Sequence, residues 1–322
     1  MERNNMTGGV RMKRNHKEDL RLDDLRCTIC CAVFMLLAAW QGLFAQDALP
    51  VSILPDRAHL HTDTLLLYSQ RTDTIMVPRL SFPAAFQQLK ANELIDSIGI
   101  LNPFWEKLRM NRLGISTDTI RIVHIGDSHI RGHIFPRTTG ELMQKAFGTL
   151  TYTDEGINGA FCVTFTRPDR IAEIAALHPD LLILSFGTNE SHNRSYNSML
   201  HYRQMDDLVR MLRDSLPNVP MLMTTPPGSY ESTRIRRRRR SYSINPRTAI
   251  AAQTIRKYAD DNGLAVWDMY EILGGIRRAC LNWQEAGLMR PDHVHYMPEG
   301  YALQGELFYQ ALIKAYNDYV EY

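Results

Sequence analysis

The stretch IRIVHIGDSH, residues 120–129, places a run of apolar and β-branched residues directly before the polar tetrapeptide Gly126-Asp127-Ser128-His129. The apolar run predicts a strand over 120–125, and the residues that follow predict a tight turn ahead of a helix. From here to its end, the chain alternates short β-type runs with amphipathic helical stretches. This alternation is typical of a parallel sheet covered by helices on both faces.

The later apolar runs and amphipathic stretches extend this pattern. Strands are expected at 181–186, 219–225 and 264–267, and helices at 138–147, 169–177, 198–216, 245–263 and 298–319. The unbroken apolar run at 181–186 suits a central strand buried on both faces. Asn245-Pro246 and Gly263 fit the two ends of one helix, because Asn caps a first turn, Pro fits within it and Gly follows a last turn. The sequence therefore predicts an α/β domain over 119–322.

Composition limits the classes of protein to which this chain can belong. Of its 322 residues, 44% are hydrophobic, which is enough for a packed core and excludes a wholly disordered chain. The formal net charge of +2 gives no global attraction to nucleic acid or to an anionic membrane, so no nucleic-acid partner is expected. The oligomeric state is not specified by the sequence.

The N-terminal residues 1–45 have the pattern of a signal peptide: a polar, basic start, an apolar run over 27–39 and a small-residue end at Ala45. Cleavage there predicts an exported protein, periplasmic or on the cell surface. The alternative is an uncleaved membrane anchor formed by 27–45, which is long enough to span a bilayer. Residues 46–118 are irregular in pattern, and we expect a lead-in or small cap with one helix over 83–109.

The five cysteines fall into two groups. Cys27, Cys30 and Cys31 open the apolar N-terminal run, whereas Cys162 and Cys280 lie in the body of the chain. No spacing typical of metal ligands occurs among them, so neither a metal nor another cofactor is expected. The last two are expected to be buried free thiols, and a disulfide between them is the alternative in an oxidising compartment.

Ser128 is the candidate nucleophile. In an open α/β sheet, ligands bind outside the carboxyl ends of the strands, so a hydroxyl in the turn after the first strand faces the ligand crevice. The Ser128 amide, at a helix N-terminus, can also donate to a developing oxyanion. Because Gly-Asp-Ser also occurs in ordinary turns and N-caps, the tripeptide needs chemical partners elsewhere in the chain.

The segment PDHVHY, residues 291–296, offers such partners directly before the last helix. Asp292 and His295 are three residues apart on one loop, so the carboxylate can hold the imidazole in the tautomer whose free nitrogen faces the serine. The alternatives are a capping pair with no catalytic role, or His293 in place of His295.

Two segments between these blocks offer hydrogen-bond donors for an oxyanion. Asn189 follows the predicted central strand, where its side-chain amide is well placed to donate, although an Asx-turn gives the same residue a purely structural role. Gly159 lies in the glycine-flanked turn GINGA, residues 156–160, and its backbone amide is the second candidate donor.

The order of these blocks resembles that of the SGNH hydrolases, also called GDSL esterases, over about two-thirds of the chain. The resemblance implies a flavodoxin-like three-layer α/β/α sandwich with a mainly parallel five-stranded sheet. It also implies Ser128 as nucleophile, His295 as general base and Asp292 as its orienting partner. Gly159 and Asn189 would then be oxyanion donors beside the Ser128 amide.

Two residues depart from the usual family pattern: Glu190 stands where Asp is usual, and His129 where Leu or a similar residue is usual. The His129 form resembles that of peptidoglycan and polysaccharide O-acetyl esterases of bacterial envelopes. The resemblance thus implies a serine esterase that removes small acyl groups, above all acetyl, from a cell-envelope or dietary carbohydrate through an acyl-enzyme. The alternatives are a carbohydrate O-acyltransferase using the same residues and a non-catalytic glycan-binding protein with the same fold.

Five further residues are candidates for substrate binding: Asp127, His129, Trp283, Arg234 and Arg236. The two arginines belong to RIRRRRR, residues 234–240, the most basic stretch of the chain, in a long connection after the strand at 219–225. This stretch can hold an anionic glycan near the crevice. The alternative is a solvated loop without a binding role.

Overall fold

A computed structural model describes residues 73–236 and 239–321, apart from the side chains of 235–239. The expected signal peptide or anchor, and the first part of the lead-in, lie outside the described residues. Among the helices that the structure does describe, none is long and apolar enough to cross a bilayer.

Five parallel strands form the central sheet, in the order β2-β1-β3-β4-β7. The strands are β1 (Ile120–Gly126), β2 (Leu150–Gly156), β3 (Leu181–Ser185), β4 (Met221–Thr224) and β7 (Ala265–Trp267). This is the flavodoxin-like order, in which the sheet grows away from β1 in opposite directions and leaves a crevice between β1 and β3 at their carboxyl ends. The predicted three-layer fold with a five-stranded sheet is confirmed.

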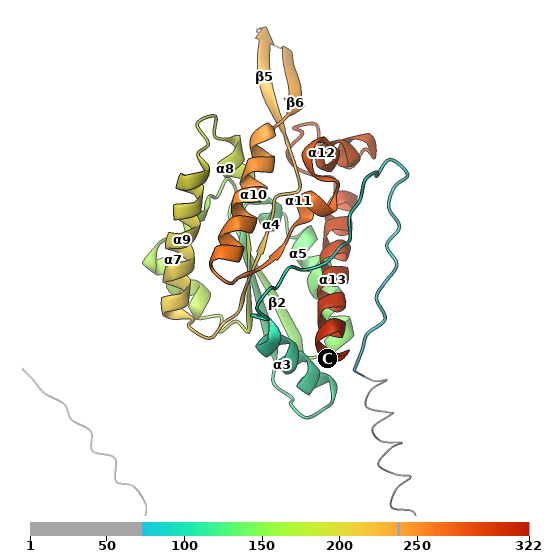
Figure 1. Ribbon diagram of the computed structural model, residues 1–322, viewed down its shortest axis with the longest axis vertical. Helices are drawn as coiled ribbons and strands as arrows, with labels where there is room; N and C mark the ends of the chain where they lie inside the picture. The colour runs from blue at the N-terminus through green and yellow to red at the C-terminus, as the bar shows by residue number, and fades with distance from the viewer. Residues whose placement is uncertain (1–72, 237–238, 322) are drawn as a thin grey trace, which may run out of the picture. The chain divides into compact units, whose positions relative to one another are not determined.

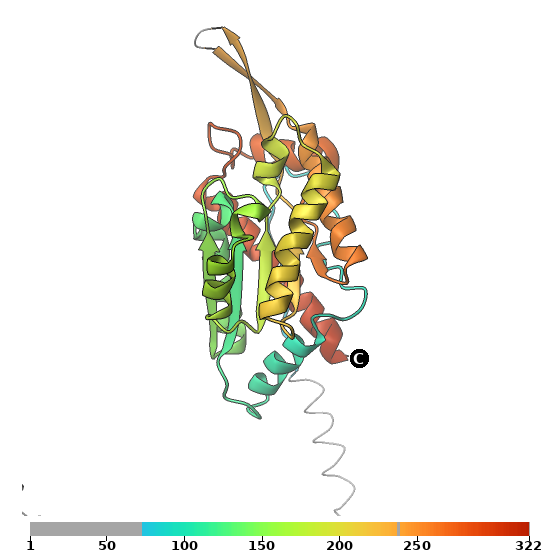
Figure 2. The ribbon, with the colours of Figure 1, turned by 90° about the vertical axis from the view of Figure 1, so that its left-hand side faces the viewer.

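Helices cover both faces of the sheet (Figures 1 and 2). One layer holds α3 (Asn102–Arg112), α5 (Ile134–Phe147) and α13 (Pro298–Glu321), and the other holds α7 (Pro168–Ala175), α9 (Ser198–Ser215) and α10 (Pro246–Asp261). Side chains of β1 alternate between the two layers: Ile122 packs in the core with α5 and α13, whereas Val123 and Ile125 pack in the core with α9. The alternation explains why this strand is apolar on both faces.

The remaining helices are α4 (Ser128–Arg131), α6 (Cys162–Phe165), α8 (Thr188–His192), α11 (Met269–Ile272) and α12 (Gly275–Glu285). The first four of them follow β1, β2, β3 and β7 in turn, so they gather at the carboxyl end of the sheet. The predicted ends of α10 are also confirmed: the Asn245 side chain accepts a hydrogen bond from the Arg247 amide at 3.1 Å, and Gly263 adopts a φ of +60° beyond the last turn.

The helix expected over 83–109 is wrong in its first two-thirds, because a regular helix begins only at Asn102. Ile95 instead forms an antiparallel bridge to Val266 of β7, with two backbone hydrogen bonds of 2.9 Å. The Asp96 carboxylate accepts from the amides of Ile100 and Leu101 across a turn at Gly99. Pairing with the sheet edge therefore satisfies backbone groups that a helix would have paired internally.

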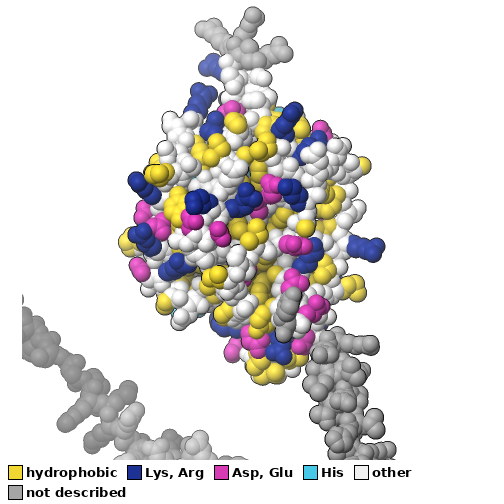
Figure 3. Space-filling model, viewed as in Figure 1, with side chains coloured by type: hydrophobic (Ala, Val, Ile, Leu, Met, Phe, Trp, Pro, Cys, Tyr) yellow, Lys and Arg dark blue, Asp and Glu magenta, His cyan; other side chains and the backbone are white. Residues whose placement is uncertain are grey.

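The basic stretch is also more regular than expected. It forms an antiparallel hairpin of β5 (Tyr230–Arg236) and β6 (Arg239–Ile244), which projects from the end of the molecule where α8 and α12 lie (Figure 1). Pairing between the two strands satisfies backbone groups that a loop would leave to solvent. On the face in Figure 3, basic and acidic side chains are intermixed over the body, in keeping with the formal net charge of +2.

Candidate active site

Ser128 stands in a turn at the carboxyl end of β1, where the sheet order reverses. A Cβ on Gly126 would lie 2.6 Å from the Ser185 carbonyl oxygen, so only glycine fits where β1 passes β3. Asp127 caps α4, because its Oδ1 accepts a hydrogen bond from the His129 amide at 2.9 Å. The turn thus places both the Ser128 hydroxyl and the Ser128 amide in the first turn of a helix.

The structure brings Ser128, His295 and Asp292 together in one hydrogen-bonded chain. Ser128 Oγ lies 2.9 Å from His295 Nε2, and His295 Nδ1 lies 2.9 Å from Asp292 Oδ2. The other carboxylate oxygen of Asp292 accepts from the amides of Val294 and His295, each at 2.9 Å. With Nδ1–H donated to Asp292, Nε2 is left to accept the serine proton.

Asp292 is held in its ionised form. Partial burial opposes ionisation, but the amides of His295 and Val294 and the His295 ring outweigh it and lower the pKa of Asp292 to about 2. A negative charge therefore faces the imidazole throughout the neutral range, where it stabilises the imidazolium that forms when the serine proton is taken.

The base of the β5–β6 hairpin holds the loop that carries Asp292 and His295. His293, between them, adopts a φ of +57°, and its carbonyl accepts a hydrogen bond from the Tyr230 amide at 2.9 Å. Its ring lies against Tyr242 of β6, with centroids 4.1 Å apart. His293 thus ties the loop to the hairpin, and His295 is the histidine that reaches Ser128.

Both expected oxyanion donors, Asn189 and Gly159, lie on the wall of one pocket with Ser128. Asn189 Nδ2 donates to the Ala160 carbonyl at 2.9 Å, and its second hydrogen faces Asp127 Oδ2 at 3.4 Å, which is long for a hydrogen bond. Burial raises the pKa of Asp127 to about 8, against the lowering effect of the His129 amide, so the carboxyl is mainly neutral at pH 7 and holds this hydrogen weakly. Of the two Asn189 hydrogens, the second is therefore the more weakly held.

The pocket has a volume of about 550 Å³, and most of the residues along its wall carry a polar group in their side chain. It is lined by Ser128, Arg131, Gly132, Asn158, Gly159, Asn189, Arg290, His295 and Tyr301. Within the described residues, no aliphatic side chain contributes to it, and neither does any residue of 73–118. Arg131 and Arg290, both exposed, were not singled out from the sequence; their only signal is that they lie next to the nucleophile and Asp/His blocks.

Three residues expected to bind substrate lie elsewhere. Asp127 is buried as the cap of α4, and Trp283 is fully buried in the core, with its ring edge-on to that of Tyr296. His129 is buried behind His295, with ring centroids 5.5 Å apart, and its Nδ1 bonds the Tyr301 hydroxyl at 2.9 Å. Contrary to expectation, these three residues are turned into the protein, because the helix cap, the core and the neighbouring ring hold them there.

The two arginines expected to bind substrate, Arg234 and Arg236, lie on β5 of the projecting hairpin. Arg234 does not line the pocket around Ser128. The hairpin geometry carries the backbone of the basic stretch away from the nucleophile, which corrects the expectation that these residues lie beside it.

A hydroxyl, an imidazole and a carboxylate linked in this order, with amide donors facing the same pocket, define the class of serine hydrolases. Residues 124–303 match the model of the GDSL-like lipase/acylhydrolase family, and the chain belongs to this family. The protein is a hydrolase that acts on ester bonds. No curated protein matches the sequence significantly.

Solved structures share the fold at low sequence identity. A peptidoglycan O-acetylesterase superposes with a TM-score of 0.63 at 19% identity, covering 70% of this chain and 99% of that chain. A GDSL-like lipase from Bacteroides thetaiotaomicron matches with a TM-score of 0.45 at 21% identity, covering 66% of this chain and 99% of that chain.

Proposed function

We propose that this esterase removes acetyl or similarly short acyl groups from a carbohydrate, with Ser128 as its nucleophile. The observation that carries the proposal is the continuous hydrogen-bonded chain from Ser128 Oγ through His295 to Asp292, at the wall of a pocket that has no aliphatic side chain among its described lining residues. This hydrogen-bonded chain of three side chains supplies an activated hydroxyl.

The reaction proceeds in two halves. As Ser128 Oγ bonds to the ester carbon, its proton passes to His295 Nε2 and the carbonyl oxygen becomes an oxyanion, which accepts from the Ser128 and Gly159 amides and from Asn189. The ester C–O bond then breaks, and the sugar oxygen leaves with the proton from His295. In the second half, water attacks the acyl-serine with His295 as base. This step releases the carboxylic acid and restores the Ser128 hydroxyl.

The composition of the pocket supports a short acyl group on a polar carrier. A long acyl chain gains affinity by burying apolar area, at about 25 cal/mol per Å², against an apolar wall. The described wall offers glycine, amide, imidazole, phenol and guanidinium groups instead. The exposed guanidinium groups of Arg131 and Arg290 fit a carrier with several hydroxyl groups and at least one carboxylate.

The name of the peptidoglycan O-acetylesterase noted above describes a substrate of this kind, an acetyl group on a carbohydrate polymer. At 19% identity that likeness supports the fold alone, so the proposed substrate, an O-acetylated cell-envelope or dietary glycan, rests on the pocket. We also propose that the chain is exported, on the strength of its basic start and apolar N-terminal run; an anchor formed by 27–45 is the alternative.

The test compares chromogenic acetyl, butyryl and octanoyl esters with the purified full-length protein, and then measures acetate release from O-acetylated peptidoglycan and polysaccharide. We expect kcat/KM to fall with acyl length, and Ser128→Ala to lose both hydrolysis and labelling by a fluorophosphonate. The exposed Ser195→Ala is the matched control and should retain both. A preference for octanoyl, or full activity of Ser128→Ala, contradicts the proposal, and acetylated sugar in place of free acetate indicates an acyltransferase.

A further inference from the structure

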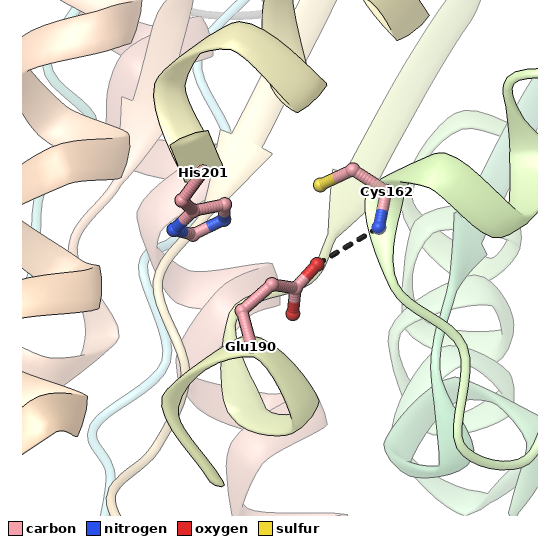
Figure 4. Close-up of side chains that lie close together, drawn as sticks. All are labelled: Cys162, Glu190 and His201. Atoms are coloured by element: carbon pink, nitrogen blue, oxygen red, sulfur yellow. Dashed lines mark hydrogen bonds between the residues drawn. The ribbon is translucent and has the colours of Figure 1, made fainter. Parts of the chain in front are cut away.

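Three buried side chains that the proposed reaction does not use meet on the α9 side of the sheet: Cys162, Glu190 and His201. Cys162 opens α6, Glu190 lies in α8 and His201 lies in the first turns of α9. Their sulfur, carboxylate and ring nitrogen atoms all lie within 4.8 Å of one another, and Figure 4 shows the three side chains turned toward a common centre. No more than 3% of any of these residues is exposed, so the cluster is sealed from solvent.

The tautomer of His201 follows from the hydrogen bonds on its far side. The Thr254 hydroxyl donates to the Ile250 carbonyl at 2.7 Å, and the Tyr196 hydroxyl donates to Thr254 Oγ1 at 3.1 Å. The Tyr196 hydroxyl already donates its only hydrogen to Thr254. Its oxygen must therefore accept a hydrogen bond from His201 Nδ1, which lies 3.0 Å away. Nδ1 therefore carries the proton, and Nε2 is an unprotonated lone pair.

That lone pair is the unexplained feature of the cluster. His201 Nε2 is buried and has no hydrogen-bond partner among the described residues, although buried polar atoms are almost always paired. Burial also lowers the pKa of His201, which keeps the ring in the neutral form. A neutral imidazole that donates one N–H to an oxygen and presents its other nitrogen bare has the arrangement of a histidine that binds a metal ion.

Glu190 and Cys162 complete a mixed donor set. The Glu190 carboxylate is oriented by the amides of Cys162, at 2.8 Å, and Gly187, at 2.9 Å, and each oxygen keeps a further lone pair. Burial, together with the neighbouring Glu190, raises the pKa of the Cys162 thiol well above its ordinary value, so without a metal the thiol keeps its proton. A bound cation would displace that proton, as metal ions do at cysteine ligands.

We propose that Cys162, Glu190 and His201 bind a divalent transition-metal ion with the preferences of Zn²⁺. One thiolate, one imidazole and one carboxylate are the ligand types that Zn²⁺ takes, and the thiolate and carboxylate charges cancel those of the ion, which makes the loaded site neutral in its buried surroundings. A second Glu190 oxygen or a water molecule completes four-fold coordination. Tetrahedral ligands at ordinary zinc distances lie about 3.3–3.8 Å apart, so loading draws the three side chains inward by about 1 Å at most.

The site would be structural, because it does not reach the pocket around Ser128. It would tie α9 to the two segments that carry the oxyanion donors: Glu190 directly follows Asn189, and Cys162 lies two residues after the Ala160 carbonyl that orients the Asn189 amide. This inference is independent of the proposed substrate and stands or fails on metal binding alone.

The test uses the full-length protein, stripped with a chelator and then titrated with Co²⁺ as a spectroscopic probe. We expect stoichiometric binding with a thiolate-to-cobalt charge-transfer band and the visible bands of a tetrahedral site, both removed by added Zn²⁺. Zn²⁺ should also raise the Tm, because it binds the folded state. Cys162→Ser should lose the charge-transfer band, and His201→Gln should weaken binding at least tenfold.

Matched controls separate this cluster from other thiols. Cys280→Ser removes the other described buried cysteine, whose sulfur bonds the Ser229 carbonyl, and should keep the spectrum. The triple variant Cys27→Ser, Cys30→Ser and Cys31→Ser should keep it as well. If Cys162→Ser does not fold, His201→Gln carries the test. The proposal is overturned if the bands are absent in the wild-type protein, if the charge-transfer band persists in Cys162→Ser, or if His201→Gln binds Co²⁺ as tightly as the wild type.

Discussion

Replacing Asn189 with alanine tests the least obvious part of the proposed mechanism, the use of a side-chain amide that already has a partner. Its Nδ2 gives one hydrogen to the Ala160 carbonyl at 2.9 Å and turns the other toward Asp127 at 3.4 Å. Losing one oxyanion donor lowers kcat by roughly 100- to 1000-fold, or about 2.7–4 kcal/mol. Asn189→Ala also leaves the buried Ala160 carbonyl unpaired, which costs roughly 1–3 kcal/mol of folding stability.

These two effects are separable by experiment. Initial rates on a chromogenic acetyl ester, measured well below the Tm of the variant, give kcat and KM, and thermal unfolding gives the stability loss. Asn193→Ala is the matched control, because Asn193 ends the same helix but is exposed and bonds only locally, to the Ser195 amide. An unchanged kcat with a raised KM would refute the reasoning, since Asn189 would then contact the substrate equally in the ground and transition states.

The remaining predictions concern charge and packing around the same site. Asp292→Asn should lower kcat by about 10⁴-fold at neutral pH. The pKa of Asp292 is lowered from 3.8 to about 2, so the ionised carboxylate stabilises the folded state fully above pH 3.8 and loses this effect as the pH falls through 2. The urea midpoints of the wild-type protein and of Asp292→Asn should therefore converge in acid. Gly156→Ala puts a Cβ 2.1 Å from the Arg131 backbone nitrogen and should lower the free energy of unfolding by at least about 1–3 kcal/mol. Gly132→Ala, whose added Cβ has its nearest neighbour at 3.6 Å, should change this free energy far less. Equal losses of the two variants in a denaturant titration would contradict the packing argument. Arg131→Gln with Arg290→Gln should raise KM for an acidic acetylated glycan more than for a neutral ester, and equal changes would remove the case for an anionic carrier.

The parts of the fold that the sequence predicted are those whose pattern is local. The apolar run at 181–186 and the Asn245-Pro246 and Gly263 ends of α10 were right because burial and capping act on neighbouring residues. The residues of β2 gave no such signal, since LTYTDEG, over 150–156, is mostly polar on an edge of the sheet. The segment around Ile95 has no local strand signal, because its pairing partner, Val266, is far away in the sequence.

The candidate site could likewise be predicted only in part from the sequence. Ser128, Asn189 and the Asp/His block could be found because each follows a strand or precedes a helix at the edge where ligands bind. Their side-chain directions could not be found, which is why His129 and Trp283 were taken for binding residues although both point into the protein. The cluster of Cys162, Glu190 and His201 could not be predicted from the sequence either, because three single residues on separate elements form no recognisable motif.

The bridge between Ile95 and Val266 has a consequence for how the protein behaves in concentrated solution. An outermost strand with free amides and carbonyls is a template for pairing with another molecule, and here a segment of the same chain already occupies that position. Removing the residues before α3 would uncover the template. Such a shortened chain should self-associate, and light scattering would detect this aggregation.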